Sequence, residues 1–119
     1  MAGLSSDLDA RRRRVCLNAA VADVSKHILV RGRVQGVGYR AFVEDQALLV
    51  GIRGWVRNRR DGSVEAVFTG EPEQVDRLIT ACRNGPPAAR VTDLAQRHAR
   101  KDELTLPRPG EIFSVLPTT

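Results

Sequence analysis

Polar and apolar residues alternate along the stretch HILVRGRV. Ile28, Val30 and Val34 fall on one side of this stretch, and Arg31 and Arg33 fall on the other. An alternation with a period of two is typical of a strand that is buried on one face only. The pattern therefore predicts a half-buried strand that leads into a glycine-containing loop.

Two further strands are predicted at residues 52–58 (IRGWVRN) and 63–70 (SVEAVFTG). The RRDG sequence between them predicts a hairpin, in which Asp61 and Gly62 form the tight corner. In the third strand Phe68 should face the core together with Val64 and Ala66. A fourth strand is predicted from ARVTDLAQRHA, a loop from KDELTLPRPGE and a short last strand from IFSVL.

Helical spacing replaces the alternation after the glycine loop, and Gly51 follows as a stop signal. The apolar residues at this spacing are Phe42, Val43, Ala47, Leu49 and Val50.

A second helix is predicted where Glu71, Pro72 and Glu73 provide a favourable first turn. Val75, Leu78, Ile79 and Cys82 then recur at i, i+3, i+4 and i+7. The Asn84-Gly85-Pro86-Pro87 sequence ends this helix.

The predicted order is therefore β-α-β-β-α-β, with a fifth short strand. Strands with one apolar face and two amphipathic helices pack as an α+β, ferredoxin-like α/β sandwich, with both helices on one face of an antiparallel sheet. The folded pattern covers residues 25–119. Residues 1–24 carry a run of four arginines but no apolar period, and are expected to be a disordered or loosely attached extension.

The chain has 119 residues, enough for one domain. Its net charge of +5 favours anionic partners, which include phosphate compounds, nucleic acid and acidic surfaces, without choosing among them. No apolar run approaches the roughly 18 residues of a membrane span, so no membrane association is expected.

The cysteines and histidines do not have the spacing of a zinc site. Cys16, Cys82, His27 and His98 form neither a C-x2-C nor an H-x3-H pair. Cys82 lies on the apolar stripe of the second predicted helix and is expected to be a core thiol. No disulfide is supported, and the composition suits a reducing cytoplasm.

The loop VQGVGYR contains the first candidate site. Gly36 and Gly38 can adopt positive φ, so that consecutive backbone N–H groups converge on an anion at a helix N-terminus. Arg40 could add a planar fork of donors for two phosphate oxygens. The loop lacks the lysine and hydroxyl of a P-loop. A tight turn with a surface arginine is the alternative interpretation.

Asn58, at the end of the second strand, is the second candidate. It shares a face with Gly54 and Val56, and a polar side chain at an apolar-facing strand end needs a partner. Its amide could bind turn backbone, or its oxygen could hold a water molecule. Trp55 falls on the opposite face and is expected to pack there or to form a partly exposed platform.

Together these two stretches resemble the acylphosphatase family. Residues 32–40 match the family pattern G-x-V-Q-G-V-x-[FY]-R at every defined position. Residues 54–70 match G-[FYW]-[AVC]-[KRQAM]-N-x3-G-x-V-x5-G in the same way. The resemblance covers roughly residues 25–119 and implies the same fold as the periodicity.

The resemblance implies hydrolysis of acyl phosphates to a carboxylate and inorganic phosphate, without a metal or other cofactor. The protein is expected to be a monomer. The resemblance also implies that Arg40 binds the phosphoryl group and that Asn58 positions the attacking water. The backbone N–H groups of the first loop would cradle the phosphate; these belong to Gln35, Gly36, Val37, Gly38 and Tyr39.

Other polar and aromatic residues are expected to have lesser roles. Tyr39 should anchor the loop against the first helix, and His27 should be a surface residue. Arg57, Arg59 and Arg60 could steer anionic substrates or form a solvated basic turn. The alternative functions are a non-catalytic anion-sensing module and an RNA-binding domain. RNA binding is disfavoured because Phe68 is the only aromatic residue of the third strand.

Overall fold

The computed structural model describes residues 22–119. The predictions for the arginine run, for Cys16 and for most of the extension lie outside these residues. Within residues 22–119, no helix is long and apolar enough to cross a membrane. The elements are β1 (Val24–Arg33), α1 (Tyr39–Leu49), β2 (Arg53–Asn58), β3 (Val64–Gly70), α2 (Pro72–Asn84), β4 (Arg90–His98), the 3₁₀ helix η2 (Lys101–Thr105) and β5 (Phe113–Val115).

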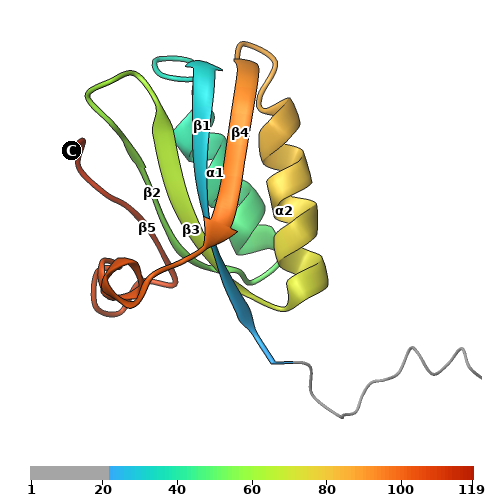
Figure 1. The fold of residues 1–119 in the computed structure, drawn as a ribbon, viewed down its shortest axis with the longest axis vertical. Helices are drawn as coiled ribbons and strands as arrows, with labels where there is room; N and C mark the ends of the chain where they lie inside the picture. The colour runs from blue at the N-terminus through green and yellow to red at the C-terminus, as the bar shows by residue number, and fades with distance from the viewer. Residues whose placement is uncertain (1–21) are drawn as a thin grey trace, which may run out of the picture.

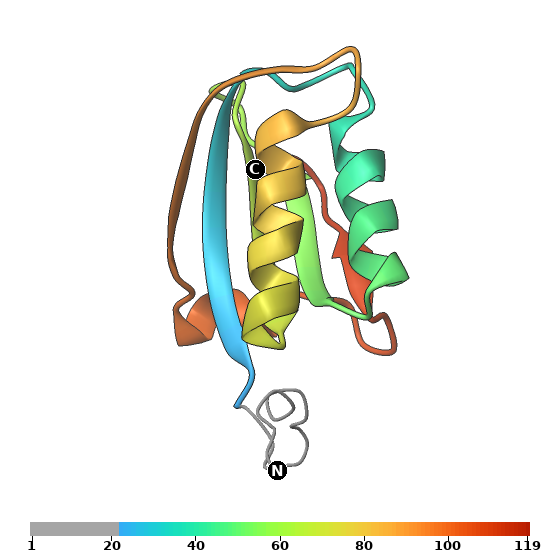
Figure 2. The ribbon, with the colours of Figure 1, turned by 90° about the vertical axis from the view of Figure 1, so that its right-hand side faces the viewer.

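The five strands form one sheet in the order β4-β1-β3-β2-β5. Both helices lie on one side of it, and η2 lies on the other (Figures 1 and 2). The predicted element order and ferredoxin-like fold are therefore confirmed. The first four strands pair antiparallel, as predicted. The short fifth strand makes the sheet mixed, because β5 pairs with β2 in parallel. The segment between η2 and β5 returns the chain to the edge of the sheet, so that β5 runs in the same direction as β2.

Helix α2 follows its sequence pattern closely. Pro72 opens it, Glu73 lies in its first turn, and its buried side chains are the four predicted apolar residues. Helix α1 follows its pattern less well: Val43 and Ala47 are buried, but Leu49 is 77% exposed. The sequence between residues 42 and 50 is apolar on more than one side, so periodicity overestimated the buried stripe.

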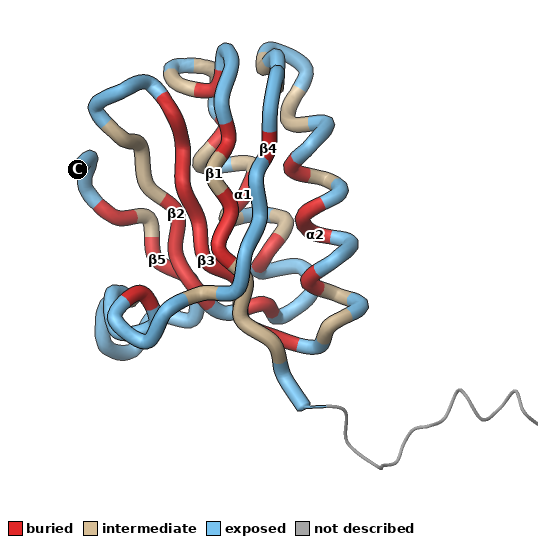
Figure 3. The backbone as a smooth tube through the Cα atoms, viewed as in Figure 1, coloured by how far each residue is buried: buried red, intermediate tan, exposed pale blue. Residues whose placement is uncertain are grey.

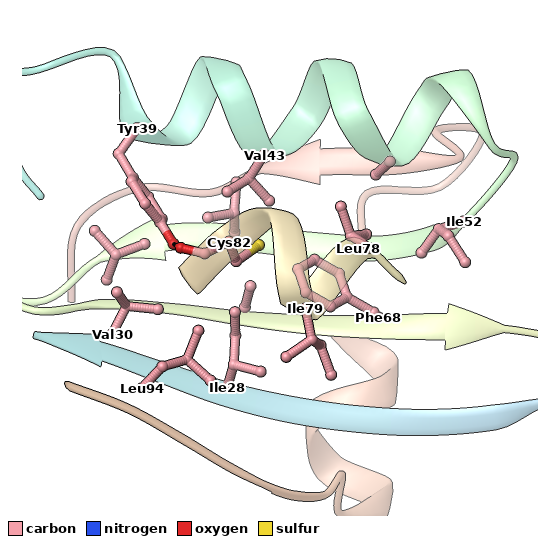
Figure 4. Packing of buried hydrophobic residues seen from close by; sticks show 14 of the residues in the cluster. Ile28, Val30, Tyr39, Val43, Ile52, Phe68, Leu78, Ile79, Cys82 and Leu94 are labelled. Carbon is pink, nitrogen blue, oxygen red and sulfur yellow. Dashed lines mark hydrogen bonds between the residues drawn. The ribbon is translucent and has the colours of Figure 1, made fainter. Parts of the chain in front are cut away.

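The main core lies between the helices and the sheet, as the red segments of Figure 3 and the side chains of Figure 4 show. Val64, Ala66 and Phe68 enter it from β3, as predicted. Cys82 is fully buried in it as a free thiol. Burial in apolar surroundings raises the pKa of the Cys82 thiol to about 12, so the thiol is an inert packing group.

A second, smaller cluster lies on the opposite face of the sheet. Trp55 and Val67 pack there with Leu116, and the Trp55 indole donates to the backbone oxygen of Glu103 at 2.7 Å. Trp55 therefore packs on the face predicted for it and is not an exposed platform. The chain after β4 covers part of this face, and the predicted loop at residues 101–111 contains η2.

His27 is also buried on this face, so the prediction that it is a surface residue was wrong. It is 6% exposed, and its Nε2 lies 2.8 Å from a carboxylate oxygen of Glu65. Its ring also meets the edge of Trp55, with 6.5 Å between centroids. His27 lies outside the alternating apolar positions of β1, which suggested that it is exposed to solvent. A segment more than 70 residues later in the chain covers it.

Candidate active site

The direction of the strands brings the two sequence motifs together. Strand β3 is antiparallel to both β1 and β2, so β1 and β2 run in the same direction and their C-terminal ends lie at the same end of the sheet. The glycine loop follows β1, and Asn58 is the last residue of β2. Residues about 20 positions apart in the sequence therefore lie at the same end of the sheet, on either side of the start of β3.

The loop has the conformation that an anion-binding turn requires. Gly36 has φ 72° and Gly38 has φ 81°, in the left-handed region that glycine tolerates best. A Cβ built on either residue would meet nothing within 4 Å. The space beside both glycines is therefore open, and it is the backbone geometry that restricts them.

Helix α1 begins directly at this loop with an uncapped N-terminus. Gly38 is the N-cap residue, it makes no side-chain cap hydrogen bond, and the first turn carries no acid. The first N–H groups of a helix have no partner within the helix. Together with the positive end of the helix dipole, they form a site that favours a phosphate group.

Arg40 is the second residue of α1 and is partly exposed. Among residues 22–119, no acidic side chain forms an ion pair with it and no hydrogen bond fixes its guanidinium group. Its donors are therefore free of internal partners in the described part of the chain, at the helix turn where the open N–H groups lie.

The Gln35 side chain connects the loop to the β2–β3 hairpin. Its Nε2 donates to the backbone oxygen of Arg59 at 2.7 Å and to that of Ser63 at 2.9 Å. Arg59 directly follows Asn58, so this amide ties the loop backbone to the residue beside the second candidate. The sequence motif had suggested a role for the backbone of Gln35 only.

Tyr39 fixes the exit of the loop to α2. Its hydroxyl donates to the backbone oxygen of Cys82 at 2.7 Å, and its ring is 1% exposed (Figure 4). The carbonyl of Cys82 is one of the last four in α2 and has no partner within that helix. The expected contact with α1 exists, at 6.3 Å between the rings of Tyr39 and Phe42, but the hydrogen bond to α2 is the specific anchor.

Asn58 has an unsatisfied amide oxygen. Its Oδ1 is buried and has no hydrogen-bond partner within residues 22–119. Its backbone is fixed on both sides, since it pairs with Val64 and its carbonyl accepts from the N–H of Thr119 at 3.2 Å. A buried acceptor without a protein partner is satisfied by a bound water or ligand. For the alternative, an amide that binds the turn backbone, no hydrogen bond from the Asn58 side chain to the turn is present within residues 22–119.

Arg57 and Arg59, on either side of Asn58, point to the face of the sheet opposite the helices, where both lie near the carboxylate of Glu65. This carboxylate lies 2.7 Å from Nε of Arg57 and 3.5 Å from Nη1 of Arg59. Burial opposes the ionisation of Glu65. The hydrogen bonds from His27 and Arg57 outweigh this effect and keep the pKa of Glu65 below its ordinary value. Sequence patterns did not identify Glu65, although an acid placed across from Arg57 on the neighbouring strand was a usable signal.

Comparison with known proteins identifies the family of the chain. The acylphosphatase family model matches residues 26–105. The chain belongs to the acylphosphatase family. An acylphosphatase of Bradyrhizobium diazoefficiens is 59% identical over 91 residues, which are 76% of this chain and 92% of the relative. An acylphosphatase of Rhodopseudomonas palustris is 56% identical over 98 residues, 82% of this chain and 99% of the relative.

Solved acylphosphatases also share the fold. The crystal structure of the Bacillus subtilis acylphosphatase superimposes with a TM-score of 0.67 at 36% sequence identity, covering 78% of this chain and 98% of that one. The family model spans both sequence motifs, so the loop, Arg40 and Asn58 all lie in the part of the chain that is acylphosphatase-like.

Proposed function

We propose that this chain hydrolyses the carboxyl-phosphate bond of acyl phosphates, with Arg40 and the loop binding the phosphoryl group and Asn58 holding the attacking water. The observation that carries this proposal is the placement of an uncapped helix N-terminus beside a buried, unpartnered amide oxygen. The first suits an anion and the second suits a water molecule, and Gln35 ties them together.

The phosphoryl group would lie against the backbone of Gln35 through Tyr39. Its oxygens would accept from the N–H groups of the loop and the first turn of α1. The Arg40 guanidinium would add two parallel hydrogen bonds and a full positive charge. The backbone donors are fixed by the loop before the reaction, so they stabilise the charge that spreads over the phosphoryl oxygens in the transition state.

Asn58 would accept a hydrogen bond from the attacking water through Oδ1. The water oxygen forms a bond to phosphorus while the bond between phosphorus and the acyl oxygen breaks. The carboxylate leaves with the electron pair, and the proton of the water passes to a phosphate oxygen. A carboxylate is a good leaving group, so no strong general acid is required, and positioning supplies most of the acceleration.

The remaining assignments belong to the same proposal. The substrates are small-molecule acyl phosphates and the product is inorganic phosphate. The protein acts as a monomer in the cytoplasm, and the catalytic domain begins with β1, whose first residue, Val24, pairs with Gly70. Family membership favours hydrolysis over an anion-sensing module or an RNA-binding domain.

Hydrolysis of benzoyl phosphate in the presence of EDTA tests the proposal, with a simple phosphate monoester as a parallel substrate. Rapid turnover of the anhydride alone, unchanged by the chelator, is the expected result. If the folded protein binds inorganic phosphate but does not turn over the anhydride, it is an anion-sensing module instead.

A further inference from the structure

The face of the sheet opposite the helices carries a groove that is separate from the candidate active site. It has a volume of about 690 Å³ and lies over β1, β3 and β4, with η2 forming one wall. Ligand pockets in proteins are typically about 300–1,000 Å³. The groove therefore has the size of a small-molecule site, and neither the phosphate loop nor Asn58 contributes to it.

The groove is lined by more basic than acidic side chains. Its ionisable residues, apart from His27, are Arg31, Arg57, Arg59, Arg97, Arg100, Glu65, Asp102 and Glu103. The five arginines exceed the three acids by two charges. The total charge of the lining residues is therefore positive, although each of the five arginines has an acidic partner.

Two of the three acids lie deeper than the exposed arginines, whereas the third, Asp102, is itself 74% exposed. The side chains of Glu65 and Glu103 are 4% and 7% exposed, whereas those of Arg31, Arg97 and Arg100 are 51%, 41% and 63% exposed. Glu65 and Glu103 thus form the floor, and the guanidinium groups of these three arginines reach the surface. Each guanidinium has five N–H donors, of which its acidic partners use only a part.

The strand register distributes these arginines along the groove. In the register of the sheet, Glu65 of β3 lies opposite Arg57 of β2 on one side and opposite Leu29 of β1 on the other. His27, two residues before Leu29 in β1, lies opposite Arg97 of β4. Successive residues on one face of a strand are about 6.6 Å apart. The guanidinium groups are therefore arranged in successive rows and not at one point, which suits a ligand with several separate negative charges.

We propose that this groove is a second anion site, which binds the oligophosphate chain of a nucleotide or of inorganic polyphosphate. The planar forks of arginine match phosphate oxygens, and an oligophosphate offers one charged group to each row in turn. A single-stranded nucleic acid fits less well, because such ligands stack their bases on aromatic rings. Among the described residues that line the groove, His27 has the only aromatic ring and is 6% exposed.

Arg31 and Arg100 are the residues whose replacement tests this site. Arg31 pairs with Asp61 on the exposed hairpin, and Glu103 keeps its two short hydrogen bonds to Arg97 when Arg100 is removed. The double variant R31Q/R100Q therefore leaves neither buried acid without a partner. A matched control is R77Q/R83Q, which removes two exposed arginines of α2, on the other face of the sheet. Both variants lower the net charge from +5 to +3.

Calorimetric titration of the full chain with inorganic tripolyphosphate at low ionic strength is the experiment. Fluorescence of Trp55 gives a local readout, because Trp55 is the only tryptophan and the Arg57 guanidinium lies 4.7 Å from its ring centre. We expect binding to be retained in Arg40→Ala, weakened about tenfold or more in R31Q/R100Q, and changed less than about twofold in R77Q/R83Q. Hydrolysis of benzoyl phosphate by both double variants should match that of the unmodified chain.

Three results would overturn the proposal: no binding, equal weakening in the two double variants, or binding that is lost in Arg40→Ala but kept in R31Q/R100Q. The last result would place the anion at the phosphate loop alone. Titration with ATP beside tripolyphosphate identifies the source, since tighter binding of ATP indicates a nucleotide. Tighter binding of a single-stranded oligonucleotide than of either would contradict an oligophosphate site and indicate nucleic-acid binding.

Discussion

The side-chain amide of Gln35 donates to the backbone oxygens of Arg59 and Ser63 at 2.7 and 2.9 Å. One side chain thus joins the phosphate loop to the hairpin that follows Asn58. Both N–H bonds of the amide are used, and Ser63 also accepts from the backbone N–H of Arg59. Gln35 is therefore a positioning residue, which sets the distance between the phosphate site and the water site.

Replacing Gln35 with Glu should lower turnover by about tenfold or more, because small displacements of reacting groups have large effects on rate. The variant has the same shape but places a carboxylate opposite two carbonyl oxygens. Activity relative to the unmodified chain should recover partly toward pH 5, where a protonated carboxyl can again donate one hydrogen bond. A pH profile of kcat parallel to that of the unmodified chain would show that Gln35 only stabilises the fold.

Much of the fold could be predicted from the sequence because the signals are local. The apolar spacing of α2, Gly51 and the Asp61-Gly62 corner each determine the conformation of their own segment. The loop and Asn58 could be identified because their chemistry is encoded in residues that are contiguous in the sequence. Their placement at the same end of the sheet is shown by the strand pairing and not by the sequence patterns.

The outer face of the sheet could not be predicted in the same way. His27 and Glu65 are 38 positions apart, and the segment that covers them begins after β4. Alternation shows which residues point away from the main core, but not whether a later segment buries them. Trp55 was the available hint, because a large aromatic residue on that face requires a cover. The parallel pairing of β5 was missed for a similar reason, since three residues carry little periodicity.

Replacing Tyr39 with Phe should reduce the free energy of unfolding by about 1–2 kcal/mol. The change removes the hydroxyl that satisfies the Cys82 carbonyl and leaves that carbonyl buried without a donor. Urea unfolding of both proteins measures the difference. A loss below a few tenths of a kcal/mol would mean that another donor replaces the hydroxyl at the end of α2.

Glu103 gives the stability of the protein a specific dependence on acid pH. The hydrogen bonds from Arg97 hold the pKa of its carboxyl at about 2, against the opposing effect of burial, with help from the N–H of Arg100. A carboxyl whose pKa is depressed in the folded state stabilises that state at pH values above its ordinary pKa. This contribution is lost as the pH falls from about 4.5 toward 2.

The variant Glu103→Gln should therefore be less stable than the unmodified chain at pH 7, by roughly 1.5–3 kcal/mol. The difference should narrow as the pH falls below about 4.5. Urea unfolding at a series of pH values gives the two curves. A difference that stays constant over this range would show that packing of the side chain, and not its charge, stabilises the fold.

Arg40→Ala should nearly abolish turnover and weaken the binding of inorganic phosphate without unfolding the domain. Arg40 makes no internal ion pair within residues 22–119, so its loss should cost little stability. Arg40→Lys should not restore the rate, because an ammonium group cannot form two parallel hydrogen bonds. Kinetics with benzoyl phosphate and inhibition by inorganic phosphate provide both readouts. Near-normal turnover in either variant would remove Arg40 from the active site.

The central claim, that Arg40 binds the phosphoryl group and Asn58 positions the water, is tested most directly by Asn58→Ala. Turnover of benzoyl phosphate and the inhibition constant of inorganic phosphate should be measured on the same preparation. We expect turnover to fall by about 100-fold or more, on the scale of losing one positioned hydrogen-bonding group, while the inhibition constant changes little. An inhibition constant that rises in parallel with the loss of turnover would contradict the proposal, because Asn58 would then bind the phosphate and not the water.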